Sequence, residues 1–522
     1  MIRQPAMAGP GSAALPRQAL LALMAAMLAA VMLVGMLQVP KKEAAMVAGS
    51  LVVFILFLLS GNHRLFCLWA VVILAPLTLA KNFEILPHMG GASSFSVDAI
   101  DPFLAMLLFF MLRDVVRGQR HHLRFSPLFL WWGAMILFGM LDVVLGPLRM
   151  MAAEEVVRMM KCYLLFFVIL NEVVRVRLFM QVAAALATGI ALEAVIGLIQ
   201  GLFKVDLGLQ ALGEATQETI RLAADATYVG GQGGFRINGL LGHPNLLAAF
   251  LSMQLPLCIA LLFSRIPAWA RLPLGAVAGL GVLALLMTLS RTGWLSFGAA
   301  MTVLYALYFI HPRLRRRFLF ARLAAAAGMA LIVLAFSGPI LKRFYDSDPG
   351  ALNFRYEWMD ASWAMIQEQP ILGWGLNTFI YHLPGRTHYG GLVGLNDALG
   401  REWPAVHDVY LLTWVEQGTF AFACFLGMHL YLIWIGLRNI RRYYNDVVFA
   451  MNLGCLCGLL SLMIDGLSSI YLRAPAPSRM FWIIAGLMVA VDYWNTANAP
   501  ARVAAPSRAR RGPLSAPVPH GT

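Results

Sequence analysis

Three arginines stand in short polar stretches between long apolar runs of the sequence: Arg236 in FRINGLLGHPN, Arg291 in TLSRTGW and Arg355 in NFRYEWMDASW. A guanidinium group is planar, stays protonated and binds phosphate through two parallel hydrogen bonds. Three such groups near one membrane surface would suit an anionic ligand, such as a diphosphate attached to a lipid. The competing interpretation is that each arginine reaches lipid headgroups or pairs with a loop carboxylate.

A fourth candidate lies in the stretch REWPAVHDVYLLTWVEQG, residues 401–418, where His407 directly precedes Asp408 and an apolar run. A neutral imidazole can take the proton of a hydroxyl group while that group attacks. The competing interpretation is a capping or packing histidine, and Asp408 fits the N-cap of the following helix. We expect the acidic neighbour to raise the pKa of His407. Arg401, at the start of the stretch, is a further candidate for substrate binding.

Two more polar positions are candidates for substrate binding. The sequence GWG at 373–375 predicts a turn with an exposed Trp374, which would stack on a sugar ring or belong to the interfacial aromatic belt. His243 precedes Pro244 and fits a helix N-terminus, where proline is favoured in the first turn. Asn245 follows directly and is the second binding candidate.

Three acidic residues lie inside apolar segments: Glu193, Glu416 and Asp465. Ionisable groups at membrane depth are costly and are functional candidates for that reason. Glu193 and Glu416 would equally well pair with arginines of the loops, so both interpretations stay open.

The composition is that of an integral membrane protein. Of 522 residues, 60% are hydrophobic and 13% are charged, whereas a soluble domain is roughly half apolar and about a quarter charged. The net charge of +14 fits an excess of Lys and Arg in cytoplasmic loops, so no nucleic-acid partner is expected. The six cysteines all lie in apolar segments and are predicted to be buried packing residues, not disulfides or metal ligands.

The hydrophobic pattern predicts an all-α integral membrane protein, a polytopic bundle of about 12–14 transmembrane helices. Ala19–Leu37 is expected to be the first span, because the run is too long for the core of a signal peptide. The candidate spans are roughly 19–37, 44–60, 65–80, 99–112, 127–146, 153–171, 178–203, 245–264, 272–290, 294–311, 318–339, 409–437, 447–466 and 478–493.

Basic loops predict the orientation of these spans. The stretches 113–124, 171–177, 264–271, 311–317 and 438–442 are rich in Lys and Arg and fall on one side together with both termini, which makes that side the cytoplasm. The opposite side then holds the two longest loops, where we expect the chemistry, since loops of that length are usually functional.

The predicted organisation has six parts. These are N-terminal transmembrane helices (1–203), a first long extracytoplasmic loop (204–244), central transmembrane helices (245–339), a large extracytoplasmic loop with the catalytic elements (340–407), C-terminal transmembrane helices (408–493) and a disordered basic cytoplasmic tail (494–522).

Several motifs are missing from the sequence. It has no Walker loop, no DxD pair placed to hold a nucleotide-sugar metal on the cytoplasmic side, and no Cys/His metal cluster. A transferase of this kind would need a donor that is already activated and attached to a lipid. No metal and no cofactor are expected.

The ordered motifs resemble the O-antigen ligase and Wzy-type polysaccharide polymerase family of bacterial inner membranes. The resemblance rests on Arg236–Asn245 (RINGLLGHPN), the turn SRTGW (290–294), the Arg355 segment that runs into QPILGWGLNTF, and His407 at the start of a span. Together these pieces cover about residues 178–437. Each piece is short, and their order makes the combination specific.

The resemblance implies a GT-C-like multi-pass enzyme of the bacterial inner membrane, with both termini in the cytoplasm and an active site facing the periplasm. Such an enzyme transfers a glycan from undecaprenyl diphosphate to an acceptor hydroxyl of lipid A–core or of a lipid-linked glycan, with inversion and without metal. Arg291 and Arg355 would bind the donor diphosphate, His407 would be the base, and Arg236 would be a further phosphate or loop-organising contact. The pair His407-Asp408 departs from the His-Asn or similar polar pair expected in relatives.

Two alternatives remain open at this point. Within the transferase reading, the motifs do not separate a polymerase from a ligase. A polytopic transporter or a flippase of lipid-linked oligosaccharides would also explain the spans and the intramembrane acids, but it predicts internal repeats and broken helices around a midplane site. The sequence shows no repeat, and its polar residues gather in the outer loops.

Overall fold

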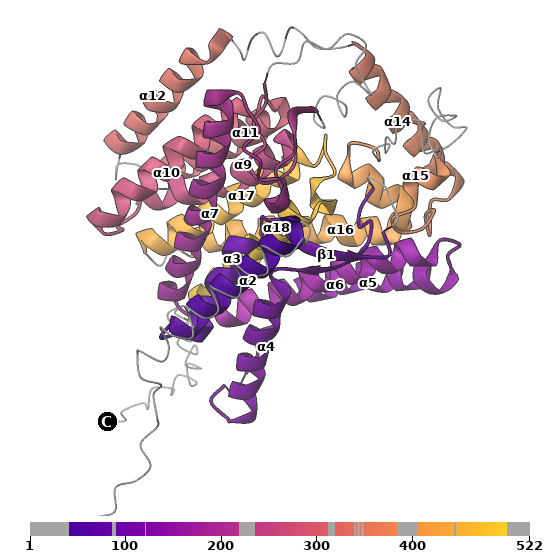
Figure 1. Ribbon diagram of the computed structural model, residues 1–522, viewed down its shortest axis with the longest axis horizontal. Helices are drawn as coiled ribbons and strands as arrows, with labels where there is room; N and C mark the ends of the chain where they lie inside the picture. Colours follow the sequence, from indigo (N-terminus) through magenta and orange to yellow (C-terminus); the bar gives the residue numbers. More distant parts are fainter. Residues whose placement is uncertain are drawn as a thin grey trace, which may run out of the picture.

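The computed structural model describes residues 41–85, 90–120, 122–218, 235–311, 319–338, 349–383, 405–442 and 445–497, together with Leu341 and Tyr345. Helices dominate these residues, and seven of the described helices are long and apolar enough to cross a membrane by length and composition. The chain is therefore an all-α polytopic membrane protein, as predicted (Figure 1).

The helices of the first half are α2 (Lys41–Leu59), α3 (His63–Leu74), α4 (Asp101–Val116), α5 (Leu128–Leu145), α6 (Arg149–Glu172), α7 (Val176–Phe203) and the 3-10 turn η1 (Gln210–Leu212). Those of the second half are α9 (Pro244–Leu262), α10 (Ala268–Met287), α11 (Arg291–Ile310), α12 (Leu319–Ala335), α14 (Pro349–Glu368), α15 (Phe379–His382), α16 (Val409–Arg441), α17 (Asp446–Asp465), η2 (Tyr471–Arg473) and α18 (Pro475–Ala497).

Every predicted span from 44–60 onward coincides with one of these helices, and the ends mostly differ by a few residues. The predicted first span, 19–37, lies outside the described residues. So does most of the predicted tail, although α18 continues to Ala497, beyond the predicted start of the tail at residue 494. The division into membrane parts and periplasmic parts stays a prediction.

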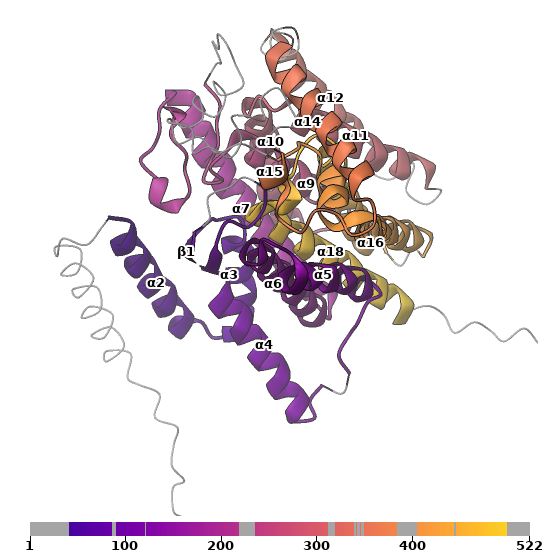
Figure 2. The same cartoon turned by 90° about the vertical axis from the view of Figure 1, so that its right-hand side faces the viewer.

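The centre of the bundle is the crossing of α9 and α17, which are both almost fully buried (Figures 1 and 2). Gly454 and Gly458 lie one turn apart on α17 and face α9. A Cβ atom added at Gly458 would lie 2.1 Å from the carbonyl oxygen of Met253, and one at Gly454 would lie 2.5 Å from the Cα of Leu257. Small residues at this spacing let two membrane helices approach closely.

A two-stranded antiparallel hairpin connects α3 to α4. Strand β1 (Ala80–Phe83) pairs with β2 (Phe95–Asp98), with Ala80 opposite Asp98 and Phe83 opposite Phe95. The apolar pattern predicted a span that reaches residue 80. The helix instead ends at Leu74, where the chain turns into the hairpin.

The large loop before α16 carries a helix of its own. Helix α14 places Trp358, Met365 and Ile366 in a small hydrophobic cluster with α15 and the first turns of α16. The buried Ala405 and Val406 belong to the same cluster. The cluster therefore fixes α14 against the segment that ends in His407.

Candidate functional site

Arg236 is held by the backbone and side chains of two neighbouring segments. Its Nε donates to the carbonyl oxygen of Thr288 at 2.9 Å, and its Nη2 donates to Oδ1 of Asn245 at 2.7 Å. The side chain is partly buried. These bonds fix the guanidinium between the first turn of α9 and the turn that precedes α11.

Gly239 makes this position of the loop possible. Its φ is +58°, in the left-handed region, and an added Cβ would lie 2.3 Å from Oε2 of Glu193. The same carboxylate oxygen accepts the backbone N–H of Leu240 at 2.8 Å. Glu193 therefore holds the loop by accepting a hydrogen bond from the loop's backbone. This structural role accounts for an acidic residue inside an apolar segment.

Arg291 is the first residue of α11 and is partly buried. The preceding Ser290 caps the helix, and its hydroxyl accepts the N–H of Gly293 at 3.4 Å. Thr292 lies near the carboxylate of Asp465, which accepts the hydroxyl of Ser469 at 2.6 Å. The start of α11 and the end of α17 therefore lie together at the same end of the bundle, where the two helices pack against each other.

His407 stands two residues before α16 and is partly buried. The carboxylate of Asp408 accepts the N–H groups of Tyr410 at 2.8 Å and Leu411 at 3.0 Å, so the predicted helix cap is confirmed. The N–H of Val409 donates to the carbonyl oxygen of Gly466 at 3.0 Å. This bond ties the start of α16 to the end of α17, beside Asp465.

Residues from four distant segments act on one another electrostatically at this end of the bundle. The charge of Arg355 acts on His407, and both Arg236 and His407 act on His243. The hydroxyl of Tyr471 of η2 lies near Asn245 and within the fields of Arg236 and Arg355. The sequence-predicted Arg236, Asn245, Arg355 and His407 are therefore neighbours.

The pKa values of the two histidines are lowered. Burial is the larger cause for His407, and Arg355 is the second, so that the pKa falls to about 4. Burial, Arg236 and His407 lower the pKa of His243 to about 3. The expected rise through Asp408 is wrong, because that carboxylate is engaged by two backbone N–H groups of the helix start and does not offset the cationic field.

Trp374 does not have the exposed ring that the sequence predicted. The turn itself is present, with positive φ at Gly373 (+74°) and Gly375 (+109°). The indole N–H, however, donates to the carbonyl oxygen of Met365 at 2.9 Å, and the ring packs 4.9 Å from that of His382. The tryptophan packs against the hydrophobic cluster that α14, α15 and the first turns of α16 form, and its ring is therefore partly buried.

The turn docks into a break in α16. Gly418 has φ +73° and interrupts the helix, and the freed carbonyl oxygens of Val415 and Glu416 accept the N–H groups of Trp374 and Gly375, both at 2.9 Å. An added Cβ at Gly418 would lie 2.1 Å from the carbonyl oxygen of Ile371. The break is thus filled by the protein's own backbone.

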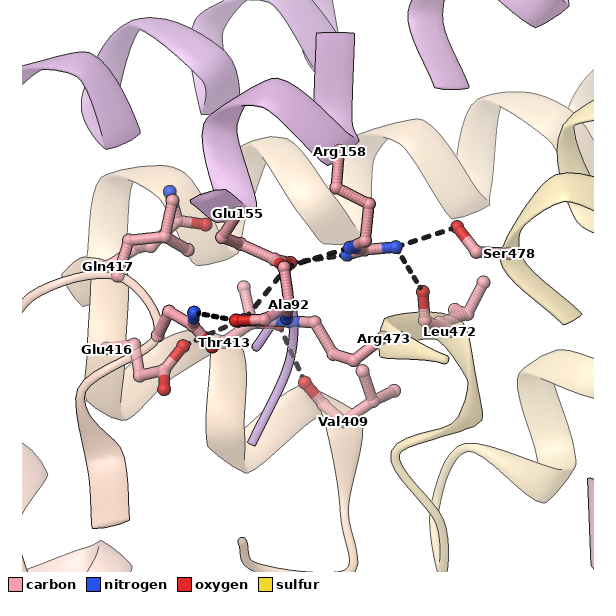
Figure 3. A network of polar contacts seen from close by, with 12 residues as sticks. Ala92, Glu155, Arg158, Val409, Thr413, Glu416, Gln417, Leu472, Arg473 and Ser478 are labelled. Carbon is pink, nitrogen blue, oxygen red and sulfur yellow. Dashed lines mark hydrogen bonds and ion pairs between the residues drawn. The ribbon is translucent and has the colours of Figure 1, made fainter. Parts of the chain in front are cut away.

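A buried ion network contacts α16 at Glu416, two residues before the break at Gly418 (Figure 3). Arg473 pairs with Oε2 of Glu416 at 2.7 Å and with Oε1 of Glu155 at 3.3 Å. Arg158 binds the second oxygen of Glu155 at 2.8 Å and Ser478 at 3.1 Å. Glu416 has an arginine partner, as one interpretation of the sequence allowed.

Sequence reasoning did not find Tyr471, Glu155, Arg158 or Arg473. The signal for Glu155 and Arg158 was available, because opposite charges three residues apart inside an apolar run must pair to be buried. No comparable signal marks Tyr471 or Arg473. The sequence-predicted Arg401 lies outside the described residues.

The arrangement joins cations and a neutral imidazole in one partly buried place. Guanidinium groups suit an anionic ligand, and a histidine with a low pKa is deprotonated near neutral pH, as a proton acceptor must be. Among the residues with a described placement, no group of three or more His, Cys, Asp or Glu side chains is arranged to hold a metal ion.

Comparison with known families decides the relationship. Residues 274–426 match the family model described as O-antigen ligase. This part of the chain is similar to the O-antigen ligase family. The match runs from α10 into α16 and includes Arg291, Arg355 and His407 of the candidate site, so the resemblance seen in the sequence is confirmed. No curated protein matches the chain.

Proposed function

We propose that this O-antigen ligase family protein transfers a glycan from undecaprenyl diphosphate to an acceptor hydroxyl on the periplasmic face of the bacterial inner membrane. The observation that carries the proposal is the position of His407 within the field of Arg355, with Arg236 and Asn245 beside the neighbouring His243 and Tyr471. A deprotonated base next to fixed cations is what an attack on a lipid diphosphate sugar requires.

In the proposed reaction, the acceptor oxygen attacks the anomeric carbon of the donor sugar from the face opposite the diphosphate. The new glycosidic C–O bond forms while the bond from the anomeric carbon to the diphosphate oxygen breaks, which inverts the configuration. His407 takes the hydroxyl proton. Undecaprenyl diphosphate leaves with the bonding electrons, and Arg291 and Arg355 stabilise its added charge, with Arg236 as a further contact.

Donor binding would also strengthen the base. The pKa of His407 is about 4 with Arg355 unneutralised, which makes the free imidazole a weak proton acceptor. A bound diphosphate offsets the arginine charges and raises the pKa of the histidine. Proton transfer from the acceptor is therefore favoured when the donor is in place.

The transporter alternative loses one of its arguments. Helix α16 is broken at Gly418, and the transporter alternative predicts such a break, but the freed carbonyl groups are bound by the segment 370–376.

The proposed function is tested by measuring glycan transfer with purified protein, undecaprenyl-diphosphate glycan and acceptor lipid, without ATP and with EDTA present. We expect His407→Ala to abolish transfer while donor binding persists.

The matched control is His63→Ala, at an exposed histidine that begins α3, which should transfer at the wild-type rate. A ladder of product lengths would indicate a polymerase and a single addition a ligase. Equal transfer by His407→Ala and wild type would remove His407 from the chemistry. Movement of the lipid across a vesicle bilayer without any transfer would favour the transporter.

A further inference from the structure

A polar cavity lies apart from the arginines and His407. It has a volume of about 200 Å³ and is lined by the β1–β2 hairpin, the start of α4, residues 154–165 of α6 and the start of α18. Polar residues that line it include Asn82, Ser94, Ser96, Glu154, Lys161 and Arg479. None of the residues assigned above to donor binding or proton transfer lines it.

Most charges around the cavity are paired with one another. Asp98 binds both Arg479 and Lys161, and Lys161 also binds Asp101 at 2.7 Å. Arg158 is paired with Glu155. These groups form a wall whose charges are neutralised within the protein.

Glu154 is the exception among them. Its side chain is 1% exposed, and among the described residues neither of its carboxylate oxygens has a hydrogen-bond partner. A buried polar group left without a partner costs roughly 1–3 kcal/mol, and such groups in native proteins are satisfied by something. A carboxylate that lines a cavity points to a ligand that donates hydrogen bonds.

The size and lining of the cavity indicate what kind of ligand fits. A cavity that holds a single water has a volume of roughly 10–15 Å³. This cavity, at about 200 Å³, is many times larger than one water or one bare cation requires. Hydroxyl, amide and ammonium groups alternate in the lining with apolar side chains such as Leu104 and Val157. A sugar ring has the same mixture of hydroxyl edges and C–H faces.

We propose that this cavity binds one sugar ring of a glycan substrate, with Glu154 accepting hydrogen bonds from its hydroxyl groups. The inference rests on the proposed function for the source of the sugar, which is either the donor glycan or the acceptor glycan. The hydroxyls of the ring satisfy the carboxylate, and Ser94, Ser96 and Asn82 contact its other edges.

The cavity is connected to the candidate site by the buried ion network (Figure 3). Arg158 lines the cavity and donates to the carbonyl oxygen of Leu472 at 3.4 Å. Leu472 stands between Tyr471, which lies near Asn245 of the site, and Arg473, which pairs with Glu155. A sugar in the cavity would therefore be connected to η2 through Arg158, which lines the cavity and bonds the backbone of η2.

The binding test uses the purified full chain and saturation-transfer NMR with a panel of neutral methyl glycosides: glucoside, galactoside, mannoside, rhamnoside and N-acetylglucosaminide. We expect saturation of at least one glycoside by wild type, and about tenfold weaker binding by Glu154→Gln, because the amide keeps only one of the two acceptor oxygens. Glu154→Leu should bind none. Because the leucine variant could fail to fold, the isosteric glutamine variant decides the result alone.

Two controls separate this cavity from other effects. Glu84→Gln removes an exposed carboxylate whose charge reaches Glu154 but which does not line the cavity, and it should keep glycoside binding. His407→Ala should also keep it, because the candidate site is separate. Absence of binding by wild type, or equal binding by Glu154→Gln, would overturn the proposal and leave a cavity filled by water.

Steady-state kinetics of glycan transfer identify which substrate places its sugar in the cavity. In the transfer assay, Glu154→Gln should raise KM about tenfold for whichever substrate places its ring in the cavity, with kcat nearly unchanged. A rise for the donor alone identifies the donor glycan, and a rise for the acceptor alone identifies the acceptor. Unchanged KM for both would refute the proposal. If wild type transfers nothing, the proposed function fails, while the NMR result still decides on the cavity.

Discussion

Replacing Arg355 by glutamine tests whether its charge keeps His407 deprotonated. The pKa of His407 falls from 6.5 to about 4, with burial as the larger cause and Arg355 as the second. The arginine therefore contributes less to the fall than burial does, and a backbone hydrogen bond with Ala405 opposes both. Removing its charge should raise the pKa by roughly one pH unit, which corresponds to about 1.4 kcal/mol.

The assay is kcat/KM for glycan transfer in proteoliposomes between pH 4 and pH 8. This parameter reports the pKa of the essential base in the free enzyme. A base acts when it is deprotonated, so activity is retained above its pKa and lost as the pH falls through it. Wild type should keep its activity down to about pH 5 and lose it towards pH 4. The acid limb of Arg355→Gln should lie about one unit higher, on a lower plateau because Arg355 also binds the donor in the proposed reaction.

Arg355→Lys is the matched variant for this experiment. It keeps the charge and loses the planar fork, so its plateau should fall while its acid limb stays with wild type. The reasoning is refuted if the acid limb of Arg355→Gln coincides with wild type or moves to lower pH. A wild-type limb near 6.5 would show that neither burial nor the arginine acts on the base in solution.

Three further predictions concern the supports of the site, each read as the midpoint of thermal unfolding in detergent. Glu416→Gln leaves Arg473 buried with a partner lost and should cost about 3–5 kcal/mol of stability; an unchanged midpoint would contradict the buried pair. Gly239→Ala places a Cβ against Glu193 at a positive φ and should destabilise by roughly 1–3 kcal/mol, whereas a stabilised variant would mean that the turn differs. Asp408→Ala removes the α16 cap and should cost about 1 kcal/mol, and Asp408→Asn, which can still accept both N–H bonds, should restore it.

The membrane helices could be predicted from the sequence because each is an uninterrupted apolar run with polar ends. The pattern at 244–262 and 446–465, for example, gives two helices that the structure places at the centre of the bundle. The pattern does not say that Gly454 and Gly458 face α9. That contact depends on the pairing of helices far apart in the chain.

The candidate site was predictable in its parts and not in its surroundings. Arg236, Arg355 and His407 stood out because polar residues next to apolar runs lie at membrane surfaces. The direction of the pKa shift of His407 was predicted wrongly, because adjacency in sequence shows neither the burial of the imidazole nor the approach of Arg355, and does not tell which group a carboxylate faces. Here the backbone N–H groups of the helix start compete successfully for it.

The position of α14 controls two properties of the site at once. The helix carries Arg355, and three residues later it places the fully buried Trp358 on Ala405 and Val406, directly before His407. Any change that separates α14 from this segment removes the charge that we propose binds phosphate, together with the field that lowers the pKa of the histidine. Arg236, Arg291 and His407 stand instead at or near the starts of membrane helices that are joined to one another. In the proposed mechanism, α14 is therefore the element that couples the binding of an anion to the basicity of the imidazole.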